Sequence, residues 1–166
     1  GLMPSATELA AAVRAGTTTA ADLVERHLAA IDAREGEIHA FNHVLAAAAR
    51  ERAAQIDEQA ARGDDPGPLA GITVALKDNM CTRGIPTTCS SKILAGWKPP
   101  YDATVVSKLQ QAGAILIGKT TTPEFGAKCL TDAPLFGRTR NAWSAAHTCG
   151  GSSGGTAAAV ASGMVP

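Results

Sequence analysis

The chain has 166 residues, with 15 acidic and 15 basic side chains and a formal net charge of zero. This balance gives no electrostatic reason to expect direct binding of nucleic acid or of an anionic membrane surface. No apolar run approaches the roughly 18 residues of a membrane span, and the N-terminus lacks the pattern of a signal peptide. We therefore expect a cytoplasmic protein that folds, most simply, as one domain.

Cysteine and histidine give little support for a metal site. The four cysteines are Cys81, Cys89, Cys129 and Cys149. None forms a C-x-x-C pair, so we expect reduced thiols and no structural zinc. His39 and His43 are spaced to share one face of a helix, but no acidic or cysteine ligand follows at a useful spacing. We expect neither a metal nor a cofactor.

The N-terminal part, residues 1–66, is predicted to be helical. Ser5 and Glu8 have the spacing of a capping box, and Thr19 begins a second segment with the same pattern. A third helix is predicted over about 45–60, which is rich in strong helix formers. A turn-rich linker follows, and the composition then changes.

The second part, residues 67–166, alternates between strand and helix patterns. The expected elements are a strand at 72–76, a helix at 102–111, a strand at 114–117 and a helix at 156–161. This order predicts an α/β fold in which helices pack on a mixed or largely parallel sheet. We expect the N-terminal helices and this sheet to form a single, incomplete domain.

Two motif matches are misleading. Residues 113–120 fit the phosphate-loop pattern, but the intervening residues are Ala, Ile, Leu and Ile, which predict a buried strand instead. Residues 150–154 fit the nucleophile elbow of α/β-hydrolases, with Ser152 at its centre. That fold places its acid and histidine after the serine, and no Asp, Glu or His follows Ser152. We expect neither ATP binding nor a Ser-His-Asp triad.

The remaining candidate chemistry lies in Lys77, at the end of a predicted strand, and in the glycine-flanked Ser152 and Ser153. Desolvation disfavours an ammonium group, so a buried lysine can act as a base without any histidine. Two structural interpretations stay open. Lys77 could pair with Asp78 or a more distant carboxylate, and the two serines could serve only to cap a helix after a tight turn.

Several blocks, in the same order, resemble the amidase signature family. They lie at 67–72 with 77–79, 102–106, 113–120, 136–141 and 150–155, where the sequence reads GGSSGG. The N-terminal helices resemble that family less specifically. The resemblance implies the amidase-signature sheet with packed helices and cleavage or transfer of small-molecule amides.

The resemblance also implies a Ser-Ser-Lys triad. It makes Lys77 the general base and Ser152 the bridging serine, preceded by a cis peptide bond. Ser153 helps to hold Lys77, and the backbone near Gly126 borders the acyl pocket. It places the nucleophilic serine further along, beyond Pro166, so we expect this truncated chain to be inactive alone. An exposed sheet edge would then favour self-association.

Three functional interpretations remain open. Residues 122–126 and 135–141 resemble stand-alone amidases, which favours a fragment of an amide hydrolase. Residues 87–94 resemble instead the A subunits of glutamine-dependent amidotransferases that act on aminoacyl-tRNA, which release ammonia for a partner. The third interpretation is a non-catalytic folding unit or an engineered chimera.

Overall fold

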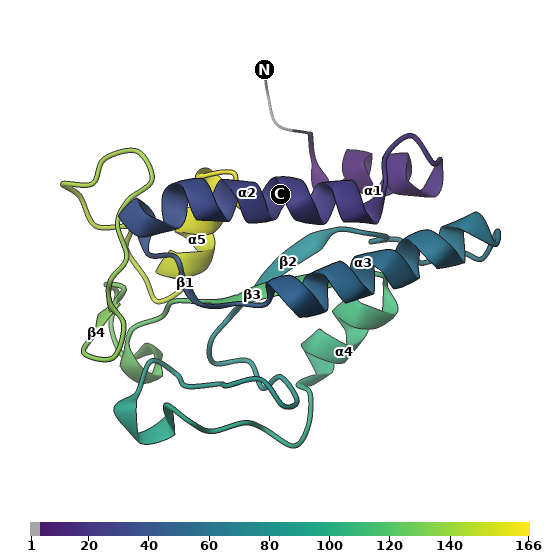
Figure 1. The fold of residues 1–166 in the computed structure, drawn as a ribbon. Helices are drawn as coiled ribbons and strands as arrows, with labels where there is room; N and C mark the ends of the chain where they lie inside the picture. The colour runs from purple at the N-terminus through teal and green to yellow at the C-terminus, as the bar shows by residue number, and fades with distance from the viewer. Residues whose placement is uncertain (1–3) are drawn as a thin grey trace.

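The structure is a computed structural model, and it describes residues 4–166. Its N-terminal part contains three helices, α1 (Ala6–Arg14), α2 (Ala20–Ile38) and α3 (Ala46–Ala61) (Figure 1). The predicted capping box is confirmed, because the Ser5 amide donates to the Glu8 carboxylate at 2.7 Å and Ser5 Oγ accepts from the Glu8 amide at 3.3 Å. These side chains satisfy amide groups that the first turn of a helix leaves unpaired.

The sequence predicted only helices in the N-terminal part, but a strand, β1 (Phe41–Val44), separates α2 from α3. The α2 helix ends at Ile38, and the next residue, His39, caps it in a left-handed conformation with a φ of 54°. The Glu35 carboxylate then accepts hydrogen bonds from the Ala40 amide at 3.0 Å and the Phe41 amide at 2.8 Å. The four residues of β1 are too few to show a strand periodicity, and pairing with a distant strand defines them.

The position of β1 also shows whether His39 and His43 share one face of a helix. His39 is the residue that caps α2, whereas His43 lies in β1, so the two do not share a helical face. Among residues 4–166, no group of three or more His, Cys, Asp or Glu side chains is arranged to hold a metal ion. All four cysteines are free thiols.

A three-stranded mixed sheet forms the centre of the fold, in the order β1–β3–β2. β2 (Thr73–Lys77) runs parallel to β3 (Ile115–Thr120), and β1 runs antiparallel to β3. The α/β prediction is therefore confirmed. The segment that matched the phosphate-loop pattern is the strand β3, as its apolar composition predicted.

Helices cover both faces of the sheet (Figure 1). In that view α2 and α5 (Gly154–Ala161) lie above the sheet, whereas α4 (Thr104–Gln111) and the long connection 78–103 lie below it. Shorter elements complete the chain: 3-10 turns at Lys92–Leu94 and Glu124–Gly126, and a small hairpin of β4 (Asp132–Ala133) and β5 (Gly137–Arg138). No helix in the described part of the chain is long and apolar enough to cross a membrane.

The core joins the N-terminal helices to the sheet. Side chains of α2 and α3 are buried with those of β3 and α5 in one cluster, which includes Leu23, Ile56, Ile117 and Ala159. A buried hydrogen bond of 2.9 Å between His27 Nδ1 and Thr73 Oγ1 links α2 directly to β2. Burial of apolar surface of this kind is the main stabilising contribution to a domain of this size.

Candidate active site

The structure brings Lys77 and Ser152 together. Lys77 is the last residue of β2, and Ser152 lies in the glycine-rich turn that leads into α5. Lys77 Nζ lies 2.6 Å from Ser152 Oγ and 3.2 Å from Ser153 Oγ. Lys77 and Ser152 are half-buried, whereas Ser153 is exposed. An amine in direct contact with a hydroxyl can transfer a proton to or from it.

The turn that presents Ser152 is held by Thr131. Thr131 Oγ1 donates to the Gly150 carbonyl at 2.8 Å and accepts from the Gly154 amide at 3.2 Å. The peptide bond between Gly151 and Ser152 is cis, which agrees with the expectation drawn from the family resemblance. Cys149 Sγ would lie 2.7 Å from a Cβ atom at position 154, so only glycine fits there.

Gly126 lies beside this turn. Its φ is 67°, and a Cβ atom built at this position would lie 3.9 Å from Ser152 Oγ. The preceding residue, Phe125, is also left-handed, with a φ of 51°, and its side chain is exposed. Gly126 therefore borders the space in front of Ser152.

Sequence reasoning missed a second lysine. Lys119 in β3 is fully buried, and its Nζ lies 3.4 Å from Asp78 Oδ1. Asp78 is thus paired with Lys119 and not with Lys77, so the structural interpretation of Lys77 as the partner of Asp78 is wrong. Burial lowers the pKa of the Lys119 ammonium, and the neighbouring Asp78 carboxylate opposes that shift.

A signal for this pair exists in the sequence. Lys77-Asp78 follows the strand predicted at 72–76, and Lys119-Thr120 follows shortly after the strand predicted at 114–117. Neighbouring parallel strands bring their carboxyl ends to the same edge. The register pairs Lys119 with Leu76 and Thr120 with Lys77. Because successive side chains of a strand point to opposite faces, the two lysines extend to opposite sides of the sheet.

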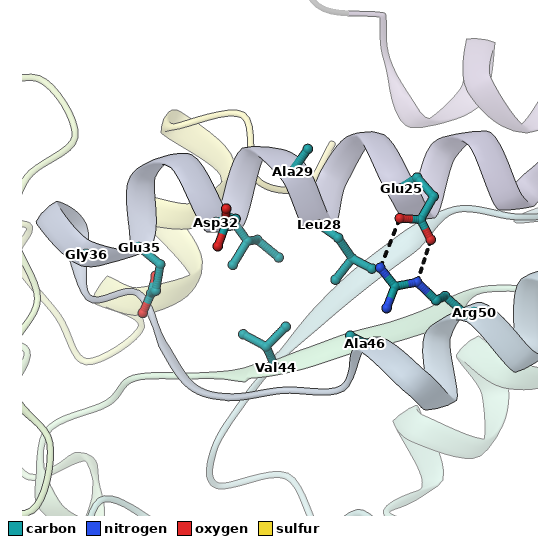
Figure 2. A pocket seen from close by; sticks show the side chains of 10 residues that line it. Glu25, Leu28, Ala29, Asp32, Glu35, Gly36, Val44, Ala46 and Arg50 are labelled. Carbon is teal, nitrogen blue, oxygen red and sulfur yellow. Dashed lines mark hydrogen bonds and ion pairs between the residues drawn. The ribbon is translucent and has the colours of Figure 1, made fainter.

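A cavity of about 620 Å³ lies elsewhere in the fold, between α2, β1 and the start of α3. Figure 2 shows Leu28 and Val44 facing each other across it, with the exposed Glu25–Arg50 ion pair at one end. None of the candidate residues lines this cavity. We therefore place the candidate chemistry at the Lys77–Ser152 contact.

The α/β core thus holds a lysine amine against a serine of a glycine-rich turn. The Amidase family model matches residues 22–166, and the chain belongs to this family. One relative is the A subunit of the glutamyl-tRNA(Gln) amidotransferase from Synechococcus sp. (strain WH7803), 52% identical over 148 residues. That match covers 89% of this chain and 30% of the relative. The chain spans about a third of the length of the curated relatives it matches.

Solved structures give the same assignment. One belongs to a vestigial protein complex connected with the evolutionary origins of an s-triazine catabolic enzyme. It superimposes with a TM-score of 0.95 at 37% identity, over 98% of this chain and 36% of that chain. A bacterial aryl acylamidase of the amidase signature family gives a TM-score of 0.93 at 31% identity, over 98% and 34% of the two chains.

Proposed function

We propose that this chain carries the general base and the bridging serine of an amide-cleaving centre. The observation that carries the proposal is the 2.6 Å contact between Lys77 Nζ and Ser152 Oγ. The unprotonated Lys77 amine accepts the Ser152 hydroxyl proton, and Ser152 Oγ accepts the proton of a nucleophilic hydroxyl that attacks the amide carbonyl. When the tetrahedral intermediate collapses, the same protons return and one is delivered to the leaving nitrogen.

Supporting roles follow from the geometry around this pair. Ser153, whose Oγ lies 3.2 Å from Lys77 Nζ, helps to orient the amine. The Gly126 backbone borders the acyl side of the substrate, because that residue lies beside Ser152. The nucleophile and its oxyanion-binding amides are expected outside residues 67–166, on the strength of the family resemblance. The proposed substrate class, a small-molecule amide, rests on the same resemblance.

A second candidate function is glutamine hydrolysis for a partner enzyme. It is favoured by the 52% identity with the A subunit of a glutamyl-tRNA(Gln) amidotransferase, which exceeds the 31–37% identity with the two solved structures described above. Both candidates use the same lysine and serine. They differ in the acyl group that the substrate pocket accepts and in the fate of the released nitrogen.

The experiment that tests the proposed chemistry uses the full product of the gene. Glutamine and a simple aryl amide are offered as substrates, and release of ammonia or arylamine is measured. We expect Lys77→Met and Ser152→Ala each to lower kcat/KM by about a thousandfold or more, because each interrupts the proton relay. Lys108→Met, at an exposed position of α4, is the matched control and is expected to leave kcat/KM unchanged.

The two substrates separate the candidates. Glutaminase activity that rises on addition of an amidotransferase partner supports the second candidate, and turnover of the aryl amide alone supports the first. Retention of most of the activity by folded Lys77→Met would contradict both.

We further propose that residues 1–66 and 67–166 form one folding unit and that the chain self-associates. Support for the first point is the single core that joins α2 and α3 to β3. Support for the second is the sheet order, in which β2 has a described partner strand on one side only. A strand with an unpaired edge is a template for pairing with another chain. Sedimentation at micromolar concentration tests this, and a monomer with one sharp thermal transition would contradict the association.

A further inference from the structure

Lys119 is the largest fully buried side chain of the described structure. Its Nζ donates to the Met80 carbonyl at 3.0 Å and to Thr87 Oγ1 at 3.0 Å, and it faces Asp78 Oδ1 at 3.4 Å. An ammonium group has three protons to donate, and these three contacts come from three points of the connection that follows β2. One side chain of β3 thus fixes the course of the chain after Lys77.

Asp78, the residue directly after Lys77, is fully buried and held from several sides. Its Oδ2 accepts from Thr88 Oγ1 at 2.6 Å and from Asn42 Nδ2 at 2.8 Å. Its backbone amide donates to the Thr120 carbonyl at 3.0 Å. A buried carboxylate with this many donors and a cation at its second oxygen cannot move without leaving polar groups unpaired.

Hydrogen bonds also connect Asp78 to the turn at 124–126, which borders the candidate site on the side of Gly126. The Asp78 carbonyl accepts from the Cys89 amide at 2.8 Å, and the Cys89 carbonyl accepts from the Phe125 amide at 2.9 Å. Ser91 Oγ donates to Glu124 Oε1 at 2.9 Å. Phe125 immediately precedes Gly126, which lies beside Ser152. Contacts therefore run from Lys119 to both sides of the Lys77–Ser152 pair.

Backbone strain marks two segments near the candidate site, one in the connection after β2 and one after β3. Cys89, Ser90 and Phe125 have φ values of 49°, 55° and 51°, a region that residues with side chains adopt only when their surroundings enforce it. Two of them share the hydrogen bond that joins residues 86–91 to the turn at 124–126. Lys119 Nζ donates to Thr87 Oγ1, two residues before Cys89, so this contact supplies part of that enforcement.

Buried ion pairs are poor sources of stability, since the cost of desolvating two charges offsets their attraction. The position of this pair suggests a different use. Lys119 pairs with the Asp78 carboxylate on the face of the sheet opposite to Lys77. The Lys77 amine therefore does not pair with Asp78, and it contacts Ser152 instead.

We propose that Lys119 is a positioning residue for the amide-cleaving centre: its ion pair with Asp78 holds the end of β2 and the turn at 124–126 in place around Ser152. This inference rests on the proposed function for its catalytic consequence, but the geometry it describes is measurable without any turnover. It adds a residue to the site that does not touch the substrate or the reacting atoms.

The experiment uses Lys119→Met in the full gene product, with Lys108→Met as the exposed control. We expect amide hydrogen exchange in residues 78–91 and 123–127 to become about tenfold faster, while exchange at the core amide of Ile115 changes little. Acylation of the Lys77 amine by a small reagent, followed by mass spectrometry, should accelerate by a similar factor. In the assay described above, kcat should fall more than KM rises.

A double variant separates positioning from simple stabilisation. Adding Asp78→Asn to Lys119→Met removes the unpaired buried carboxylate, so we expect the thermal midpoint to recover while local exchange stays fast and kcat stays low. Should Lys119→Met fail to fold, Thr87→Val removes one of the three Lys119 contacts and should give a smaller change of the same kind.

Two results would overturn the inference. One is unchanged exchange and unchanged Lys77 acylation in a folded Lys119→Met protein, or in Thr87→Val where Lys119→Met does not fold. The other is full recovery of kcat together with stability in the double variant. Failure of the proposed function is recognised separately, because Lys77→Met would then remain active while the exchange and acylation data still decide the role of Lys119.

Discussion

Lys77 and Ser152 are 75 positions apart in the sequence, and yet Lys77 Nζ and Ser152 Oγ are separated by 2.6 Å. The contact exists because β2 ends where the turn before α5 begins. The adjacent Thr120, paired with Lys77 in the sheet, is hydrogen-bonded through Oγ1 to Thr156 Oγ1 of α5 at 2.7 Å. The last residues of the parallel strands β2 and β3 thus contact the serine turn and the α5 helix that follows it.

The two serines of the turn should differ in importance. Ser152 is half-buried and in close contact with Lys77, whereas Ser153 is exposed and more distant at 3.2 Å. We expect Ser152→Ala to lower kcat/KM by at least about a hundredfold more than Ser153→Ala, because in the proposed relay only Ser152 passes the proton onward. Steady-state kinetics of the full gene product measure this. Equal losses in the two variants would show that neither serine has the bridging role.

Gly155 is predicted to tolerate no side chain. A Cβ atom at this position would lie 2.7 Å from the Ala40 carbonyl oxygen. That oxygen belongs to the backbone and cannot rotate away as a side chain could. We expect Gly155→Ala to lower the free energy of unfolding by about 1–3 kcal/mol or more, because the backbone must shift to relieve the overlap. Urea unfolding followed by circular dichroism gives the value.

The matched control for this change is Gly36→Ala. Gly36 lies within α2, and a Cβ atom there meets nothing within 4 Å. Alanine has the higher helix propensity, so this variant should gain about 0.5–1 kcal/mol. A similar loss of stability in both variants would contradict the packing that the structure gives to Gly155.

Stability should depend on pH through His27. Burial, assisted by the nearby Arg26, lowers the pKa of His27 to about 4 in the folded protein. An unfolded histidine titrates near pH 6.5, so between about pH 6.5 and 4 the unfolded state binds a proton that the folded state does not. The free energy of unfolding should therefore fall as the pH is lowered through this window, by up to about 3 kcal/mol from this residue.

Unfolding of His27→Gln at pH 7 and at pH 4.5 tests that expectation. The variant should lose a smaller part of its stability on acidification than the wild type does. His147→Gln, at an exposed position, is the control and should show the wild-type dependence on pH. An unchanged pH dependence in His27→Gln would mean that His27 is protonated in the folded state.

Thr131 should stabilise the serine turn. Its hydroxyl is the partner of the Gly150 carbonyl and of the Gly154 amide, and the side chain is buried. Thr131→Val keeps the shape but leaves these backbone groups unpaired, which should cost about 1–3 kcal/mol of unfolding free energy. The exposed Thr104→Val is the comparison, measured by the same denaturation. Equal stability of the two variants would contradict the role of Thr131.

Features that depend on residues close together in the chain follow from spacing and composition. Spacing and composition predict the caps at Ser5 and Thr19. They also predict the apolar runs of β2 and β3 and the glycine turn before α5. The order of these elements is enough to predict an α/β fold. Lys77 is a candidate because an ammonium group at the end of a buried strand is costly to desolvate, and the GGSSGG turn is a candidate because of its resemblance to the amidase signature family.

Pairings between residues far apart in the chain depend on how the elements pack in the folded protein. β1 is a strand because β3 lies beside it, and four residues carry no periodicity of their own. Asp78 takes Lys119 as its partner, although Lys77 is adjacent in sequence, because consecutive side chains of a strand point to opposite faces of the sheet. The Lys77–Ser152 contact likewise depends on how α5 packs on the sheet, which is a property of the assembled core rather than of either segment alone.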